Sequence, residues 1–148
     1  DYTTGVLMYR KANGGYGVED VVRGQWSTDH RDAVMRETAE LDRSRGEVLQ
    51  LIPQDPGAAG KSQAFYFIRL LAGFWVEAET ESGDKVTRAD AGLASQWNAG
   101  NVELVRGSWN APFLDELLTF PQGRNDDQVD GASGAFNRLA AVSPGVFL

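Results

Sequence analysis

The sequence passes from a turn into a helix at Phe120-Pro121-Gln122-Gly123-Arg124-Asn125-Asp126-Asp127-Gln128-Val129-Asp130, which sets three carboxylates within five residues. On a helix, Asp130 can share a face with Asp126, four residues earlier, or with Asp127, three residues earlier. Carboxylates this close repel one another, and a divalent cation would relieve the repulsion. The alternative is a plain acidic first turn, which the helix dipole favours. The spacing alone leaves both interpretations open.

Apolar residues follow the acidic stretch at helical spacing, at Val129, Ala132, Phe136 and Leu139. The spacing predicts a helix over about 126–141 with this face in the core. Burial of that face would fix the carboxylates relative to a neighbouring sheet.

Strand and helix patterns alternate along the rest of the chain. Strands are predicted over 5–11, 17–26, 48–52, 74–78 and 102–105. Helices are predicted over 29–43, from about 60 to 73, over 90–97, and within 109–120, the last opened by Pro112. Asn13-Gly14-Gly15 would close the first two strands into a hairpin, and 81–85 is a polar loop. We expect one mixed α/β domain over 1–148.

Two of these helices have faces that we expect to contact the core. The helix over 29–43 would be capped by Ser27 or Thr28. Its apolar face is weak and consists of Val34, Thr38 and Leu41. The helix after residue 60 has a clearer face, consisting of Ala64, Phe67, Ile68 and Leu71.

A further carboxylate, Asp55, follows the apolar strand over 48–52 and lies between two prolines. The ends of buried strands often border clefts in α/β proteins, so Asp55 is a candidate site residue. The alternative is a turn-forming aspartate before Pro56. Asp55 becomes a stronger candidate for a site residue only if it lies beside the acidic cluster at 126–130.

The same loop nearly matches a phosphate-binding loop, because Asp55-Pro56-Gly57-Ala58-Ala59-Gly60-Lys61-Ser62 follows a strand and precedes a helix. Asp55 occupies the first glycine position of that motif. A carboxylate there would face the phosphates that the loop must hold with backbone N–H groups. Lys61 could instead contact a DNA phosphate or simply be solvated.

Composition limits the classes of function. The net charge of −7 argues against a general positive field that coats nucleic acid, so DNA contacts must be local. The absence of cysteine excludes disulfides and thiolate metal sites. No stretch reaches the ~20 apolar residues of a membrane span, and no signal peptide is visible, so we expect an intracellular setting. The single histidine, His30, fits an exposed residue at a helix start, and we assign it no catalytic role.

Taken together, these strings resemble the C-terminal nuclease domain of phage terminase large subunits, which has an RNase H-like fold. The resemblance spans nearly the whole chain, in the family's order. The matching segments are 1–6, 54–61, 100–110 and 120–130.

The resemblance implies an α/β, RNase H-like mixed sheet flanked by helices, and an endonuclease that cuts concatemeric viral DNA during packaging. Two Mg²⁺ or Mn²⁺ ions would be held by carboxylates, one activating water and the other stabilising the leaving oxygen. The catalytic and metal-binding positions would be Asp55, Asp126, Asp127 and Asp130. Double-stranded DNA would meet Lys61, Arg106 and Arg124. The implied partners are the portal protein and the small terminase subunit, in the cytoplasm of a bacterial host.

The sequence departs from the family's pattern at three points. Asn125 stands where a histidine is common, and Asp55 stands where a glutamate is common. The family's first catalytic aspartate lies on a central strand just before the segment matching Asp1-Tyr2-Thr3, so we expect this chain to lack that strand. Two alternative functions therefore remain: a P-loop-like nucleotide-binding domain and a non-catalytic docking fragment of a packaging motor.

Overall fold

The computed structural model describes residues 2–80 and 90–141, so the predicted loop at 81–85 lies outside the described residues. The chain divides into two compact units. The first unit consists of Asp1–Gln25 and Gly83–Leu148, and the second of Trp26–Ser82. Each unit has its own sheet and its own hydrophobic core.

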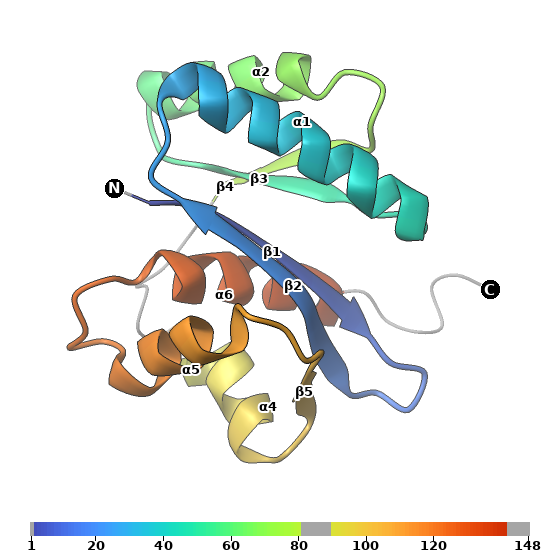
Figure 1. Cartoon of the computed structure of the whole chain (residues 1–148), viewed down its shortest axis with the longest axis vertical. Coiled ribbons are helices and arrows are strands. Elements are labelled where there is room, and N and C mark those ends of the chain that lie inside the picture. The colour runs from blue at the N-terminus through green and yellow to red at the C-terminus, as the bar shows by residue number, and fades with distance from the viewer. Residues whose placement is uncertain (1, 81–89, 142–148) are drawn as a thin grey trace. The chain divides into compact units, whose positions relative to one another are not determined.

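The first unit contains a three-stranded mixed sheet (Figure 1). Strand β1 (Thr3–Arg10) pairs antiparallel with β2 (Tyr16–Gly24), and β2 pairs parallel with the short β5 (Val102–Leu104). Gly14, with φ of 91°, allows the tight turn between β1 and β2, which the Lys11 N–H closes by donating to the Gly15 carbonyl at 2.7 Å. The predicted hairpin is confirmed.

The helices of the first unit are η1 (Asp90–Ala94, a π-helical turn), α4 (Ser95–Asn98), α5 (Asn110–Thr119) and α6 (Asp127–Ala140). The helix predicted over 90–97 thus consists of two short pieces. Helix α5 begins two residues before Pro112, which lies in its first turn. Helix α6 runs along β1 (Figure 1), and a Cβ on Gly131 would lie 2.9 Å from the Val6 side chain.

One core cluster joins the sheet and helices of this unit. Its buried members are Tyr16, Val18, Val21, Leu93, Phe113, Ala132 and Phe136. Val129 is also buried, and Leu139 packs against the cluster. The face predicted for the helix over 126–141 is therefore confirmed, and it fixes α6 against the sheet.

The second unit contains α1 (Thr28–Arg45), β3 (Gln50–Gln54), α2 (Ala58–Leu70) and β4 (Val76–Thr80). Strands β3 and β4 pair in parallel and are connected through α2, which forms a β-α-β unit. Ile52, Ala64 and Leu71 meet Ala39 of α1 in the core. Ser27 caps α1, accepting a hydrogen bond from the His30 N–H at 3.4 Å, and His30 is exposed as expected.

The face predicted for α1 is wrong at Leu41, which is 50% exposed, while Val34 and Thr38 are partly buried. Ala39 and Asp42 are buried instead, and Met35 packs against the core. Residues 35, 39 and 42 share one helical face, but that face includes a carboxylate. Asp42 is tolerated there because the Gln50 side chain donates a hydrogen bond to it at 3.1 Å. An apolar pattern alone therefore does not identify Asp42 as an inward position.

The described elements confirm the predicted mixed α/β architecture. The strands form two sheets, β1-β2-β5 and β3-β4. Among residues 2–80 and 90–141, no helix has both the length and the apolar character that a membrane crossing requires.

Candidate functional site

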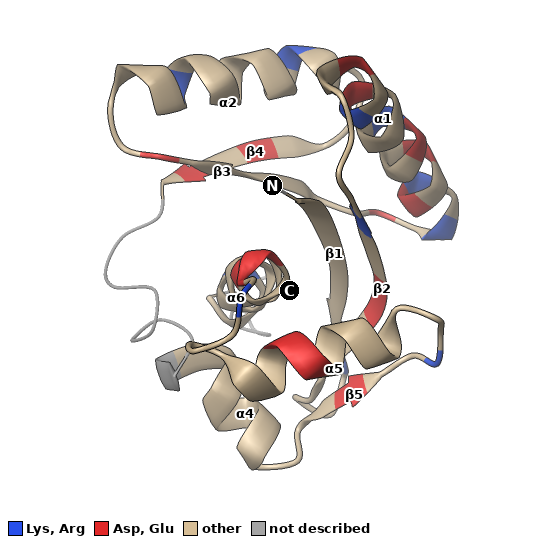
Figure 2. Cartoon of the chain, turned by 60° about the vertical axis from the view of Figure 1, so that its left-hand side comes forward, with Lys and Arg blue, Asp and Glu red and all other residues tan. Residues whose placement is uncertain are grey.

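The acidic stretch identified in the sequence forms the start of α6. Asp126 is the N-cap residue, and Asp127 and Asp130 lie in the first turn. Asp126 is exposed, while the other two are partly buried. The structure thus brings three predicted site residues into one helical turn. Figure 2 shows acidic positions on both α5 and α6.

Asp127 is held by side chains from two strands. Thr4 on β1 donates its hydroxyl to Asp127 Oδ2 at 2.6 Å. Arg23 on β2 donates from Nε to Oδ2 at 2.8 Å and from Nη2 to Oδ1 at 3.4 Å. Two strands therefore fix the orientation of this carboxylate.

These contacts also decide the ionisation of Asp127. Burial is the largest single influence and opposes the charged form. The hydrogen bonds from Arg23 and Thr4, the helical backbone and the Arg23 charge together outweigh it, so the pKa of Asp127 lies below its ordinary value. Asp127 is therefore a carboxylate at neutral pH.

A second carboxylate, Glu116 on α5, lies behind this turn and was missed in the sequence. Its side chain is only 5% exposed. Glu116 Oε2 accepts hydrogen bonds from the N–H groups of Gln128 at 2.6 Å and Val129 at 2.8 Å. Oε1 accepts from the Gln128 amide at 2.9 Å. The available signal was a glutamate three residues after Phe113, on the face of α5 that faces the core.

Arg23 connects the two carboxylates. Its Nη2 lies 3.6 Å from Glu116 Oε1, and its guanidinium also binds Asp127. The ring of Tyr2 covers the guanidinium, with its centroid 3.6 Å from Cζ. The hydrogen bond with Asp127 raises the pKa of Arg23 further. The result is a cluster of two carboxylates and one cation at the base of α6.

A family described as the terminase RNaseH-like domain matches residues 1–139. The chain belongs to this family. No curated protein matches the sequence. The match confirms the family and the RNase H-like fold expected from the sequence, and it covers both compact units.

The geometry of the terminase domain limits how a metal ion could be held. Hard carboxylate oxygens are suitable ligands for Mg²⁺ and Mn²⁺. However, among the described residues no group of three or more His, Cys, Asp or Glu side chains could hold a metal ion. The three aspartates of the α6 turn do not form such a group. The two oxygens of the Asp127 carboxylate already accept hydrogen bonds from Arg23 and Thr4.

Asp55 belongs to the second unit of the terminase domain, in the loop between β3 and α2. It is exposed, and its side chain makes no hydrogen bond or ion pair with any residue of the described ranges. Its position relative to Asp127 therefore stays a prediction.

The structure of this loop does not favour the nucleotide-binding alternative. Helix α2 already begins at Ala58, and the Lys61 N–H donates to the Gly57 carbonyl at 3.2 Å, as a helical bond. A Cβ on Gly60 would overlap the Asp55 carbonyl oxygen. In a phosphate-binding loop the helix starts later, near the lysine, whose N–H points at phosphate, whereas here the Lys61 N–H is bonded within a helix that began at Ala58.

The predicted DNA-contacting residues are all exposed. Arg106 lies between β5 and α5, Arg124 lies just before α6, and Lys61 lies in the first turn of α2. None of these three side chains is engaged by another described residue in an ion pair.

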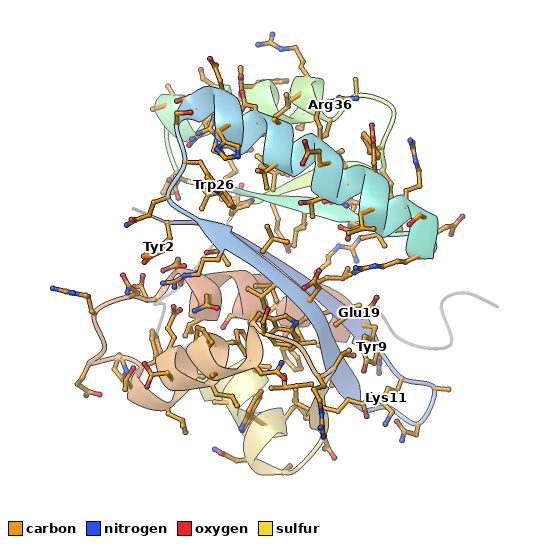
Figure 3. The ribbon with its side chains drawn as sticks, in the orientation of Figure 1. Tyr2, Tyr9, Lys11, Glu19, Trp26 and Arg36 are labelled. Atoms are coloured by element: carbon orange, nitrogen blue, oxygen red, sulfur yellow. The ribbon has the colours of Figure 1, made fainter. Side chains whose placement is uncertain are left out.

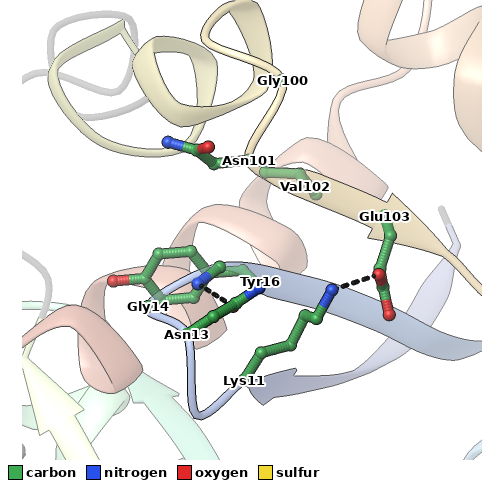
Figure 4. A pocket seen from close by; sticks show the side chains of 9 residues that line it. Lys11, Asn13, Gly14, Tyr16, Gly100, Asn101, Val102 and Glu103 are labelled. Atoms are coloured by element: carbon green, nitrogen blue, oxygen red, sulfur yellow. Dashed lines mark hydrogen bonds and ion pairs between the residues drawn. The ribbon is translucent and has the colours of Figure 1, made fainter.

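Two hollows lie at opposite ends of the β1–β2 hairpin, marked by Tyr2 and Lys11 (Figure 3). The hollow of about 220 Å³ is lined by Tyr2, Arg23 and Trp109 among others, beside the carboxylate cluster. The other, of about 210 Å³, is polar and contains the ion pair between Lys11 and Glu103 at 2.8 Å (Figure 4). It contains no predicted site residue.

Proposed function

We propose that this chain is a metal-dependent endonuclease domain of a DNA-packaging terminase large subunit. It cuts concatemeric double-stranded DNA in the cytoplasm of a bacterial host, with the portal protein and small terminase subunit as partners. The observation that carries the proposal is the family match over residues 1–139, which includes the acidic start of α6.

The ligands that we propose for Mg²⁺ or Mn²⁺ are Asp55, Asp126, Asp127 and Asp130. The charged state of Asp127 supports this set, because metal ligands must be deprotonated. This ligand set rests on the family match, because no group of three or more candidate ligands occurs among residues 2–80 and 90–141.

Ions bound there would activate a water molecule and stabilise the leaving oxygen of a phosphodiester. The residues of the chain have supporting tasks. Arg23 and Thr4 orient Asp127, while Arg106, Arg124 and Lys61 contact phosphates. Because the net charge is −7 and the basic residues are few and local, we expect DNA binding to be weak and to fall steeply with added salt.

The experiment that tests this function is Mn²⁺-dependent cleavage of supercoiled plasmid, with Mn²⁺ binding measured by calorimetry. We expect Asp127→Asn to lower cleavage by about 100-fold, because a metal ligand contributes several kcal/mol to the transition state. Asp55→Asn should weaken both readouts. Asp115→Asn, an exposed position on α5, is the matched control and should cleave like the wild type.

Cleavage that persists unchanged in Asp127→Asn would contradict the proposed site. A wild-type chain that neither binds Mn²⁺ nor cuts DNA would favour a docking role in the packaging motor. Binding of a triphosphate that depends on Lys61 would instead favour the nucleotide-binding alternative.

A further inference from the structure

We propose that Glu116 is a positioning residue, which fixes the acidic first turn of α6 and, through Arg23, the Asp127 carboxylate. The proposal rests on the proposed function, because it assigns Glu116 a role in preparing the metal ligands. Nothing in the sequence pattern of the acidic stretch points to Glu116, which lies on a different helix.

The first observation is the way in which α6 is capped. The first N–H groups of a helix have no partner within the helix and need a cap. Asp126, the N-cap residue, makes no side-chain cap bond. Glu116 supplies the acceptor instead, receiving the N–H groups of Gln128 and Val129 at 2.6 and 2.8 Å. Glu116, from another helix, is therefore the residue that caps α6.

The second observation is the cost of burying Glu116. A buried carboxylate is unfavourable unless it is hydrogen-bonded or paired. Glu116 accepts hydrogen bonds from two backbone N–H groups and from the Gln128 side-chain amide. It also forms an ion pair with the Arg23 guanidinium, and it lies at the positive end of α6. These contacts are strong and directional, so they hold α5 and the start of α6 in one fixed arrangement.

The third observation is the link to Asp127. The same guanidinium that meets Glu116 donates two hydrogen bonds to Asp127, and Thr4 donates a third. The position of Asp127 therefore depends on Glu116 both through the backbone of α6 and through Arg23. The cluster has two carboxylates against one guanidinium, and its excess negative charge favours the approach of a cation.

The test uses the full chain with Glu116→Gln, which keeps the size of the side chain but removes its charge and one acceptor. Asp115→Asn, on the exposed side of the same helix, is the charge control. Val18→Ala, in the core of the same unit, is the stability control. The two readouts are amide hydrogen exchange at Gln128 and Val129 and the affinity of the folded protein for Mn²⁺.

We expect Glu116→Gln to speed exchange at Gln128 and Val129 about tenfold, the usual effect of losing a helix cap. We also expect it to weaken Mn²⁺ binding at least about tenfold, as for other residues that orient metal ligands. Asp115→Asn should change neither readout. Val18→Ala should lower the melting temperature without changing the affinity of the folded protein for Mn²⁺.

Unchanged exchange at Gln128 and Val129 would overturn the inference, whatever happens to metal binding. Faster exchange with wild-type Mn²⁺ affinity would also overturn it, because Glu116 would then be a structural cap only. If the wild type itself binds no Mn²⁺, the proposed function fails, while faster exchange would still support the fixing of the turn. If Glu116→Gln does not fold, Arg23→Lys replaces it, and wild-type Mn²⁺ affinity in that variant would overturn the link to Asp127.

Discussion

Asp127 and Asp55 were both predicted as metal ligands, and the structure places them in very different surroundings. Asp127 is partly buried and receives hydrogen bonds from Thr4 and Arg23, on two strands. Asp55 is exposed, in a loop, and its side chain has no interaction with the other described residues. One carboxylate is held in place before any ligand arrives, while the other is free to adjust.

The comparison teaches that a shared residue type does not imply a shared role. A ligand that is already oriented loses little entropy when it binds, but it must first give up its existing partners. A ligand in an exposed loop has no partners to give up, but it must be ordered. On binding an ion, Asp127 would lose little entropy, whereas Asp55 would have to be ordered first.

The largest expected difference between the two regions is in stability. Glu116→Ala, behind Asp127, should lower the free energy of unfolding by about 2–4 kcal/mol, because it removes a helix cap and leaves buried N–H groups unsatisfied. Asp55→Ala should change it by less than about 0.5 kcal/mol, as at other exposed positions. Urea unfolding followed by circular dichroism measures both. Equal losses of unfolding free energy in the two variants would contradict the proposed difference between the two regions.

Glycines in the two regions provide a second contrast. Gly60→Ala should destabilise the chain by about 1–3 kcal/mol, because the new methyl group would overlap the carbonyl of Asp55. Gly134→Ala, on α6, should stabilise it by about 0.5–1 kcal/mol, since no atom lies within 4 Å of the added carbon and alanine favours helix. The melting temperatures of both variants, compared with that of the wild type, measure these changes in stability. A stabilising Gly60→Ala would show that the loop holding Asp55 is open.

The smallest expected effect is the pH dependence of the stability that Asp127 contributes. The pKa of Asp127 is lower in the folded chain than its ordinary value of 3.8, so its contribution to stability is present above that value. The contribution is lost as the pH falls through the lower, folded pKa. The stability difference between wild type and Asp127→Asn should be about 1 kcal/mol near pH 6 and should shrink toward pH 3. Parallel curves from urea titrations would contradict the prediction.

Much of the fold could be predicted from the sequence, because its signals are local. The Asn13-Gly14-Gly15 turn, the β-branched strands and the apolar spacing of α6 each depend on neighbouring residues. The face of α1 could not be found this way. Its inward residue Asp42 depends on Gln50, which lies beyond the end of the helix.

The candidate site was only partly predictable for the same reason. Three carboxylates adjacent in sequence were easy to recognise, and they do share one turn. Arg23 and Glu116 were missed, because each acts on α6 from another element. A charged residue on an otherwise apolar helix face, as Glu116 is on α5, was the signal that sequence reasoning could have used.

The parallel pairing of β2 with β5 has a consequence for the order of assembly. Tyr16 pairs with Val102, so the whole of the second unit, Trp26–Ser82, is synthesised between two partners of one sheet. The second unit contains all of its own strands and can fold as the chain leaves the ribosome. The first unit must wait for β5, which pairs with β2, and for α6, which packs along β1. We therefore expect folding intermediates in which the middle of the chain is native and its two ends are not.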